Sequence, residues 1–142
     1  MKTSTFEIKI SAPVQTVWCA ISTTEGVESW GGSLKIDSNW ELGSPIVITC
    51  YDDKGEIVEH DGGKMIFNGI IEVKNENKEI TFSYTGKAAG LEKERYVLEE
   101  VDANTTRVSF TQTYNSEEKA KDGMEAQKEI MGMLKNKLEE EI

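Results

Sequence analysis

The chain has 142 residues, a formal net charge of −10 and an isoelectric point of about 4.6. A polyanion is repelled by phosphate backbones and anionic lipid surfaces, so the charge disfavours nucleic acid and membranes as partners. No apolar run approaches the roughly 20 residues that span a bilayer, and the first residues lack the apolar stretch of a signal peptide. We therefore expect one soluble, cytoplasmic domain over residues 1–142, a length near the common domain size.

The two cysteines, Cys19 and Cys50, are too far apart in the chain for a CxxC motif, and no histidine cluster accompanies them. Cys19 lies in a helical pattern and Cys50 at the end of an apolar strand. The sequence predicts two buried free thiols, as is usual for a reducing compartment. A disulfide between them would require close Cα atoms, which a sequence does not show.

The first residues predict a strand followed by two short helices. Thr5–Ile10 alternates apolar and polar side chains, as a half-buried strand does. Pro13 is well placed in the first turn of a helix. The apolar residues that then recur at helical spacing are Val14, Val17, Trp18 and Ile21. Thr23 and Thr24 offer hydroxyl caps for a second short helix, which ends at Trp30 and the two glycines after it.

A run of strands fills the middle of the chain. Alternation of apolar and polar residues marks them, and polar or glycine-containing turns separate them. The candidates are Leu34–Asp37, Pro45–Tyr51, Lys64–Val73, Glu79–Thr85, Leu91–Val101 and Thr106–Tyr114. Consecutive strands joined by short turns form an antiparallel meander.

A long helix is predicted from Asn115 or Ser116 to the C-terminus. Its apolar stripe follows alternating four- and three-residue steps, and the opposite face is charged. The stripe consists of Ala120, Met124, Gln127, Met131, Leu134 and Leu138. An antiparallel sheet with one apolar face needs a cover, and this helix is the only element large enough. The expected fold is therefore α+β: a curved antiparallel sheet of about six to seven strands wrapped around a long C-terminal helix.

This layout resembles the START-like, helix-grip proteins, which are also called the SRPBCC superfamily. Within that superfamily, the chain is similar to the family homologous to the C-terminal domain of the activator of the heat-shock 90 chaperone ATPase. The residues that carry the resemblance are Ala12–Ser22, Glu25–Trp30, Trp40–Pro45, Gly69–Val73, Tyr96–Val101, Thr105–Phe110 and Gly123–Leu138. The resemblance covers nearly the whole chain, and the order and spacing of the motifs carry its specificity. It implies a pocket between the helix and the sheet.

The period-two pattern of the strands predicts the lining of that pocket. One face of the last strand carries Val108, Phe110, Gln112 and Tyr114, and we expect it to face the helix. Tyr96 and Leu98 on the preceding strand carry Glu94 and Glu92 to the same side. On Lys64–Val73 the same pattern turns Met65, Phe67, Gly69, Ile71 and Val73 inward. The residues expected to bind a ligand are Trp30, Phe67, Phe82, Tyr84, Glu94, Tyr96, Phe110, Gln112, Met124, Gln127 and Met131.

Several of these assignments leave an alternative open. Each large aromatic residue can equally be plain core. Glu94 and Gln112 mark the polar end of the cavity if the strand register holds, but Glu94 can also sit at an open strand end and meet solvent. Trp18 fits an apolar helix face inside the core, whereas the resemblance places Trp30 at the mouth of the cavity.

Signals for catalysis or metal binding are poor. The chain contains no GxSxG, no HExxH and no glycine-rich phosphate loop. The single histidine, His60, stands in the run Glu59-His60-Asp61, which is more typical of a solvated turn than of a metal site. We expect no metal and no cofactor. Acid–base chemistry would need Glu94 together with Tyr84 or Tyr96.

Three functions follow as hypotheses. The first is non-catalytic binding of a small hydrophobic or amphipathic molecule, lipids included, between helix and sheet. The second is a co-chaperone-like interaction with a chaperone ATPase, in which the acidic surface meets a basic partner. The third is an enzyme of the cyclase or hydratase type that uses Glu94. The first is preferred, which makes an enzyme the less favoured expectation.

Overall fold

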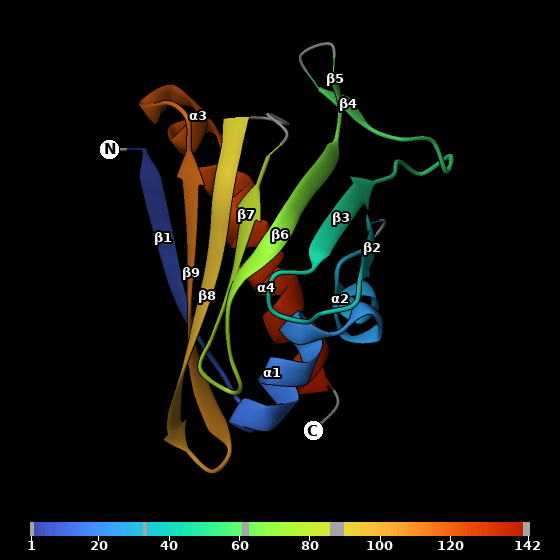
Figure 1. The fold of residues 1–142 in the computed structure, drawn as a ribbon. Helices are drawn as coiled ribbons and strands as arrows, with labels where there is room; N and C mark the ends of the chain where they lie inside the picture. Colours follow the sequence, from blue (N-terminus) through green and yellow to red (C-terminus); the bar gives the residue numbers. More distant parts are fainter. Residues whose placement is uncertain (1, 33, 61–62, 86–89, 141–142) are drawn as a thin grey trace.

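The computed structural model describes residues 2–32, 34–60, 63–85 and 90–140. A seven-stranded antiparallel sheet, in the order β1-β9-β8-β7-β6-β3-β2, forms the main layer (Figure 1). Its strands are β1 (Thr3–Ile10), β2 (Leu34–Ser38), β3 (Pro45–Cys50), β6 (Ile66–Asn75), β7 (Glu79–Tyr84), β8 (Leu91–Asp102) and β9 (Thr105–Tyr114). A separate pair, β4 (Glu59–His60) and β5 (Gly63–Lys64), lies beyond the end of β6.

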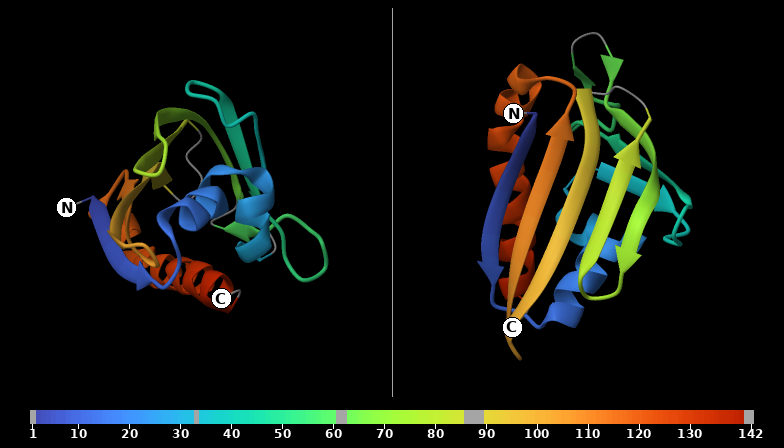
Figure 2. Two further views of the ribbon diagram at one scale, coloured as in Figure 1. Left: turned by 90° about the horizontal axis from the view of Figure 1, so that it is seen from below. Right: turned by 60° about the vertical axis from the view of Figure 1, so that its left-hand side comes forward.

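The helices are α1 (Val14–Ser22), α2 (Thr24–Trp30), α3 (Glu117–Asp122) and α4 (Met124–Glu140). The sheet curves around α4, and the two short helices α1 and α2 close the remaining side of the concave face (Figure 2). Thr23 separates α1 from α2, and its hydroxyl accepts a 2.9 Å hydrogen bond from the Gly26 amide as the N-cap of α2. The expected α+β helix-grip fold is confirmed.

The C-terminal helical segment is divided at Gly123, so the prediction of one continuous helix is wrong. Ser116, not Asn115, caps α3, and its hydroxyl accepts a hydrogen bond from the Lys119 amide. A Cβ atom on Gly123 would lie 2.3 Å from the Tyr114 hydroxyl oxygen. Only a residue without a side chain allows this close approach between the helical segment and the end of β9.

Two β-bulges change which side chains face the helix. The register of β6 against β7 shifts between Ile71 and Val73, so Val73 lies opposite Thr81, on the face away from the inward Ile80. Lys74 comes to the concave side instead, and its ammonium donates a hydrogen bond to the Trp40 carbonyl. The prediction that Val73 faces inward is therefore wrong, because the extra residue inverts the alternation.

A second bulge lies in β8, where the register against β9 shifts between Leu91 and Lys93. Leu91 pairs with the buried Tyr114, and Glu92 is exposed. The expectation that Glu92 shares the inward face of Glu94 is wrong for this reason. Glu94 itself lies opposite Gln112 and keeps the inward position.

The buried apolar residues form one cluster between the sheet and the helices. Trp18, Trp30 and Trp40 all belong to it, and Phe110, Met131 and Leu134 have no exposed surface. Cys50 is half-buried but Cys19 is exposed, so the prediction of two buried thiols holds only in part; α1 turns Cys19 away from the core. The two thiols are free.

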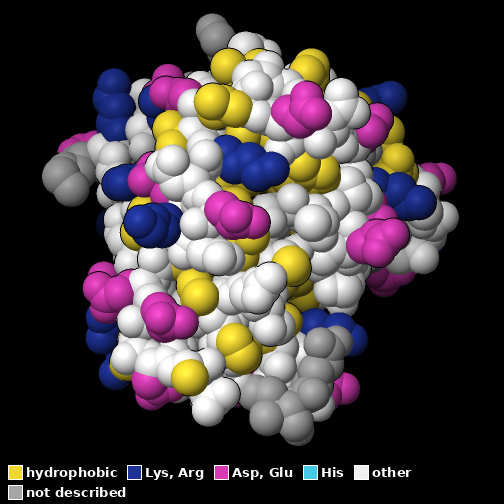
Figure 3. Space-filling view, turned by 60° about the horizontal axis from the view of Figure 1, so that its bottom comes forward, with side chains coloured by type: hydrophobic (Ala, Val, Ile, Leu, Met, Phe, Trp, Pro, Cys, Tyr) yellow, Lys and Arg dark blue, Asp and Glu magenta, His cyan; other side chains and the backbone are white. Residues whose placement is uncertain are grey.

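Acidic and basic side chains are interspersed on the surface, with hydrophobic side chains between them on the face drawn in Figure 3. Exposed ion pairs join the strands: Arg95–Glu79, at 2.9 Å, connects β8 to its neighbour β7, and Lys93–Glu72, at 3.0 Å, reaches across β7 from β8 to β6. Such pairs contribute little to stability. Within the described ranges, no helix is both long enough and apolar enough to cross a membrane.

Candidate functional site

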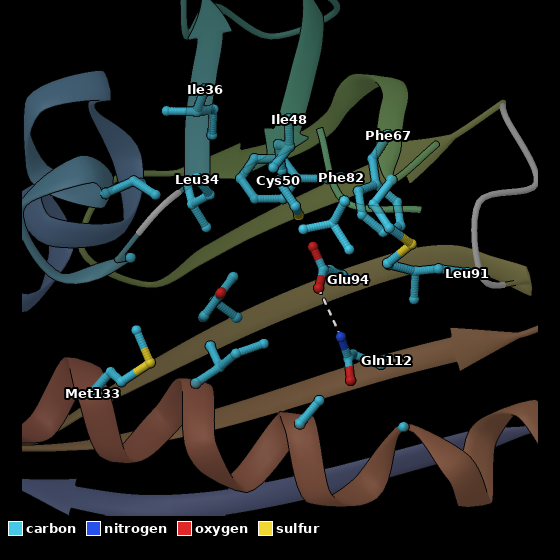
Figure 4. A pocket seen from close by; sticks show the side chains of 18 of the residues that line it. Leu34, Ile36, Ile48, Cys50, Phe67, Phe82, Leu91, Glu94, Gln112 and Met133 are labelled. Atoms are coloured by element: carbon cyan, nitrogen blue, oxygen red, sulfur yellow. Dashed lines mark hydrogen bonds between the residues drawn. The ribbon is translucent and has the colours of Figure 1, made fainter. Parts of the chain in front are cut away.

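A cavity of about 620 Å³ lies between the concave face of the sheet, helix α2 and the helical pair α3–α4. Its walls are mainly apolar. Leu34 and Ile36 from β2, Ile48 and Cys50 from β3, and Met133 from α4 point into it (Figure 4). A volume of this size is in the range of small-molecule sites, roughly 300–1,000 Å³.

The cavity reaches the molecular surface along helices α3 and α4. Three of its lining residues there, Asp122, Ala126 and Met133, are exposed, and Met133 keeps 39% of its surface. Glu59 on β4 is also exposed and lies on the same rim. A molecule can therefore enter without separating the helices from the sheet.

Glu94 and Gln112 form the polar centre of the cavity (Figure 4). The Gln112 side-chain amide donates a 2.8 Å hydrogen bond to Glu94 Oε2, and the Tyr84 hydroxyl donates one of 2.6 Å to Glu94 Oε1. The Tyr114 hydroxyl donates to Gln112 Oε1 at 3.2 Å. This chain fixes the direction of the Gln112 amide, so its NH₂ group faces the carboxylate.

The antiparallel register explains why these side chains meet. Glu94 on β8 lies directly opposite Gln112 on β9 and Phe82 on β7, and opposite residues share one face of the sheet. Tyr84, two residues after Phe82, points to the same face. Three neighbouring strands thus bring one carboxyl, one amide and two aromatic rings together.

Burial dominates the electrostatics of the polar centre. Desolvation raises the pKa of Glu94, and the hydrogen bonds from Tyr84 and Gln112 oppose part of that rise. Burial raises the pKa of Tyr114 to about 12, with a further contribution from the charge of Glu94. The pKa of Cys50 is also raised, first by burial and then by Glu94. The two tyrosines closest to Glu94, Tyr84 and Tyr96, have pKa values well above the usual range for the same reasons.

Aromatic rings wall the polar centre. The rings of Phe82 and Tyr96 meet edge to face with centroids 6.4 Å apart. Tyr96 also stacks on Phe110 at 4.4 Å, which connects the cavity wall to the core. Phe67 and Tyr84 lie 5.6 Å apart on β6 and β7. Gly69 allows this approach, because a Cβ atom there would lie 2.9 Å from the Tyr84 ring.

Of the residues expected from the sequence to bind a ligand, six line the cavity: Trp30, Phe67, Phe82, Glu94, Tyr96 and Gln112. Trp30 is 7% exposed, and its indole nitrogen donates to the Ala20 carbonyl, so it forms an inner wall rather than an open rim. Glu94 is partly exposed, and the surface it lines is that of the cavity. Of its two alternative placements, the structure shows the one inside the cavity.

The other five expected residues do not line the cavity. Phe110 and Met131 are fully buried in the core, and Tyr84 lies behind the lining, where its hydroxyl donates to Glu94 and its ring packs against Phe67. Gln127 turns toward β1 and β9, where its amide donates to the carbonyls of Ser4 and Phe110. Met124 is 43% exposed outside the lining. Phe110 and Tyr84 share a strand face with lining residues. The residues of α4 that line the cavity are Ala126, Ile130 and Met133, which lie on a helix face beside the predicted stripe of Met124, Gln127 and Met131.

Several residues that line the cavity were not predicted from the sequence. Leu34, Ile36, Ile48 and Cys50 come from two short strands, and none of the four has a charged or amide side chain that would mark a cavity. Leu91 faces inward only because of the bulge at residue 92. Gly123, at the break between α3 and α4, also lines the cavity.

The described residues include no group of three His, Cys, Asp or Glu side chains that could hold a metal ion. The run Glu59-His60-Asp61 extends to residue 61, which lies outside the described residues. The chemistry of the cavity rests on its titratable and amide side chains, of which Glu94 and Gln112 are joined in the polar centre. The others are Cys50, Glu59, Tyr96, Tyr114, Lys119 and Asp122.

Solved structures with the same fold come from several bacteria. ChR145 from Cytophaga hutchinsonii is 20% identical with a TM-score of 0.74, over 98% of this chain and 94% of that one. The Aha1 dimer from Colwellia psychrerythraea is 21% identical with a TM-score of 0.70, over 98% and 97% of the two chains. CalU16 from Micromonospora echinospora is 15% identical with a TM-score of 0.69, over 94% and 71%.

No functionally curated protein matches the sequence. The sequence profile of one family, described as "Activator of Hsp90 ATPase homolog 1-like protein", matches residues 11–142. The match covers the strand-helix corner, the meander and the terminal helices that carried the resemblance. The chain belongs to the family of Activator of Hsp90 ATPase homolog 1-like proteins.

Proposed function

We propose that this protein binds a small hydrophobic or amphipathic molecule in the cavity between the sheet and helix α4. The observation that carries the proposal is the combination of an apolar space of about 620 Å³ with one polar centre, Glu94 and Gln112. Small-molecule sites have this composition, in which apolar walls supply affinity and a few polar groups fix orientation. Burying Glu94 and Gln112 also costs stability, because both side chains lose hydration. A purely apolar core without a binding role would avoid this cost.

Native mass spectrometry of the purified protein tests the proposal. The protein would be unfolded in denaturant, washed free of small molecules, refolded, and offered a library of lipids and apolar metabolites. We expect saturable one-to-one complexes with apolar molecules and a rise in the melting temperature that increases with ligand concentration. Absence of any saturable complex across the library would overturn the proposal.

A variant separates the cavity from the surface as the place of binding. Ala126 lines the cavity on α4, whereas Lys128 on the same helix is exposed and lies outside the lining. Ala126→Phe should abolish the complexes, because the added ring fills the entrance. Lys128→Phe adds the same ring elsewhere and should leave them unchanged. Equal effects of the two variants would place binding on the outer surface.

A second candidate function comes from the family. Its description names an activator of a chaperone ATPase, and one structural neighbour bears the name Aha1. Under this hypothesis the acidic surface, at a net charge of −10, contacts a basic region of the chaperone. Stimulation of the ATPase activity of the chaperone from the same organism, falling with added salt, would support it. No change in ATP turnover at saturating protein would contradict it.

Acid–base chemistry at Glu94 is the third candidate, and the 2.6 Å bond from the Tyr84 hydroxyl is the geometry that favours it. A carboxyl group with a raised pKa beside a phenol can transfer protons to a bound molecule. Once a ligand is identified, conversion of that ligand would be lost in Glu94→Gln while binding persisted. A ligand recovered chemically unchanged after long incubation would contradict this candidate.

A further inference from the structure

Glu94 is an acidic group that has hydrogen-bond donors around it but no positive charge. Its two carboxyl oxygens accept hydrogen bonds from Tyr84 at 2.6 Å and from Gln112 at 2.8 Å, and both donors are neutral. Within the described part of the chain, no Lys or Arg pairs with it, and none influences its pKa. A carboxylate has about four lone-pair sites, so two remain for a bound molecule.

The hydrogen bonds around Glu94 leave its carboxylate able to accept from a further donor. The Tyr114 hydroxyl donates to Gln112 Oε1, so the Gln112 NH₂ group is directed at Glu94. The Tyr84 hydroxyl likewise donates its hydrogen bond to Glu94. Both neighbours stabilise the ionised carboxylate and oppose the effect of burial on its pKa. Within the described part of the chain, Glu94 therefore has neutral partners and no counter-charge; Lys119 also lines the cavity but is not among these partners.

The walls beside Glu94 also favour a positively charged group. Phe82 lies directly opposite Glu94 on the neighbouring strand, and Tyr96 follows Glu94 by two residues on the same face. Both rings line the cavity. The faces of aromatic rings attract cations, most strongly where water is excluded. The rest of the lining is mainly apolar and suits a hydrocarbon body, and its charged members are Glu59, Lys119 and Asp122.

From this geometry we propose that the cavity selects amphipathic amines: an ammonium head at Glu94 and an apolar body along β2, β3 and α4. The inference rests on the proposed ligand-binding function and specifies its chemical class. An ammonium head supplies the missing charge and fills the free acceptor positions with charge-assisted hydrogen bonds. An alcohol head can donate to one free acceptor position of Glu94, but it carries no positive charge. A carboxylate head is repelled by the negative charge of Glu94. The net charge of −10 also raises the local concentration of cations over anions.

Three ligands with the same tail and different heads test the inference: decylamine, 1-decanol and decanoate. Their dissociation constants would be measured by calorimetry near neutral pH with the native, ligand-free protein. Decylamine should bind at least about tenfold more tightly than 1-decanol, since a charge-assisted hydrogen bond is roughly twice as strong as a neutral one. Decanoate should bind most weakly.

Glu94→Gln should bring the affinity for decylamine down to that for 1-decanol and leave 1-decanol within about twofold, because an amide keeps the shape but carries no charge. Glu92→Gln is the matched control: it removes the same charge from the same strand at an exposed position outside the lining. Its preference for the amine should equal that of the native protein. Thermal unfolding of both variants shows whether they are folded.

Several results would overturn the inference. Tighter binding of decanoate, or equal binding of all three ligands by the native protein, would contradict it while leaving the proposed cavity function intact. So would an unchanged amine preference in folded Glu94→Gln. If none of the three ligands bound, the proposed function itself would fail. The comparison within the native protein is decisive even if Glu94→Gln does not fold.

Discussion

Gly123 and Tyr114 are in direct steric contact: a Cβ atom on Gly123 would lie 2.3 Å from the Tyr114 hydroxyl oxygen. The same hydroxyl donates to Gln112, which donates to Glu94. Tyr114 therefore connects the break between α3 and α4 with the polar centre of the cavity: its phenol contacts Gly123 and is hydrogen-bonded to Gln112. A side chain at residue 123 cannot be added without moving either the helix or the phenol.

Substitution of Gly123 by Ala should destabilise the protein by about 1–3 kcal/mol, the usual cost of forcing extra atoms into a packed contact. Chemical denaturation gives the free energy of unfolding. Gly132 provides the matched control on the same helix, because a Cβ atom there would meet open space. Gly132→Ala should stabilise by up to about 1 kcal/mol through helix propensity. Equal effects of the two changes would show that the contact with Tyr114 carries no cost.

The sequence predicted the fold because the alternation and the turn residues agree over most of the chain. In β9, for example, Val108, Phe110, Gln112 and Tyr114 are all buried, as the period-two pattern requires. The bulges at residues 72 and 92 left no such signal, since each adds one ordinary residue to a strand. Each bulge inverts the alternation beyond it, which is why Val73 and Glu92 were assigned to the wrong face.

The site was less predictable than the fold, because periodicity shows the face of a residue but not its depth. Phe110 and Gln112 share one face of β9, yet one is packed in the core and the other lines the cavity. Gln127 and Met133 lie on the same helix, and only the structure shows that Gln127 joins α4 to β1. The polar residue that the sequence did mark on β8, Glu94, is in the cavity.

Gln127 should contribute to stability and not to ligand binding. It is 2% exposed, and its amide donates to the backbone carbonyls of Ser4 and Phe110. Gln127→Ala leaves buried groups without partners and should destabilise by about 1–3 kcal/mol. The affinity for 1-decanol should stay within about twofold, as measured by calorimetry below the melting temperature. A large loss of affinity without loss of stability would place Gln127 in the binding site after all.

The stability contribution of Glu94 should depend on pH in a defined direction. Burial raises its pKa in the folded state above 4.5, the ordinary value. The folded protein therefore binds this proton more tightly than the unfolded chain does. The contribution to stability is fully present below about pH 4.5 and is lost as the pH rises through the folded-state pKa.

This dependence is measured as a difference between two proteins. The free energy of unfolding of the native protein minus that of Glu94→Gln should decrease from pH 4.5 upward and then level off. Glu79 and Glu139 have lowered pKa values and act in the opposite direction, but they are present in both proteins and cancel. A difference that rises with pH over this range would show that Glu94 has a lowered pKa.

We propose that a small apolar molecule occupies the space between the sheet and α4. A titration of the labelled protein with 1-decanol, followed by amide chemical shifts, tests it most directly. We expect saturable shifts of Ile36, Ile48, Phe82 and Met133, which line the cavity, and no shifts at the exposed residues Glu7 and Lys9 of β1, a strand that contributes nothing to the lining. Shifts confined to the outer face, or no saturable shift at all, would contradict the claim.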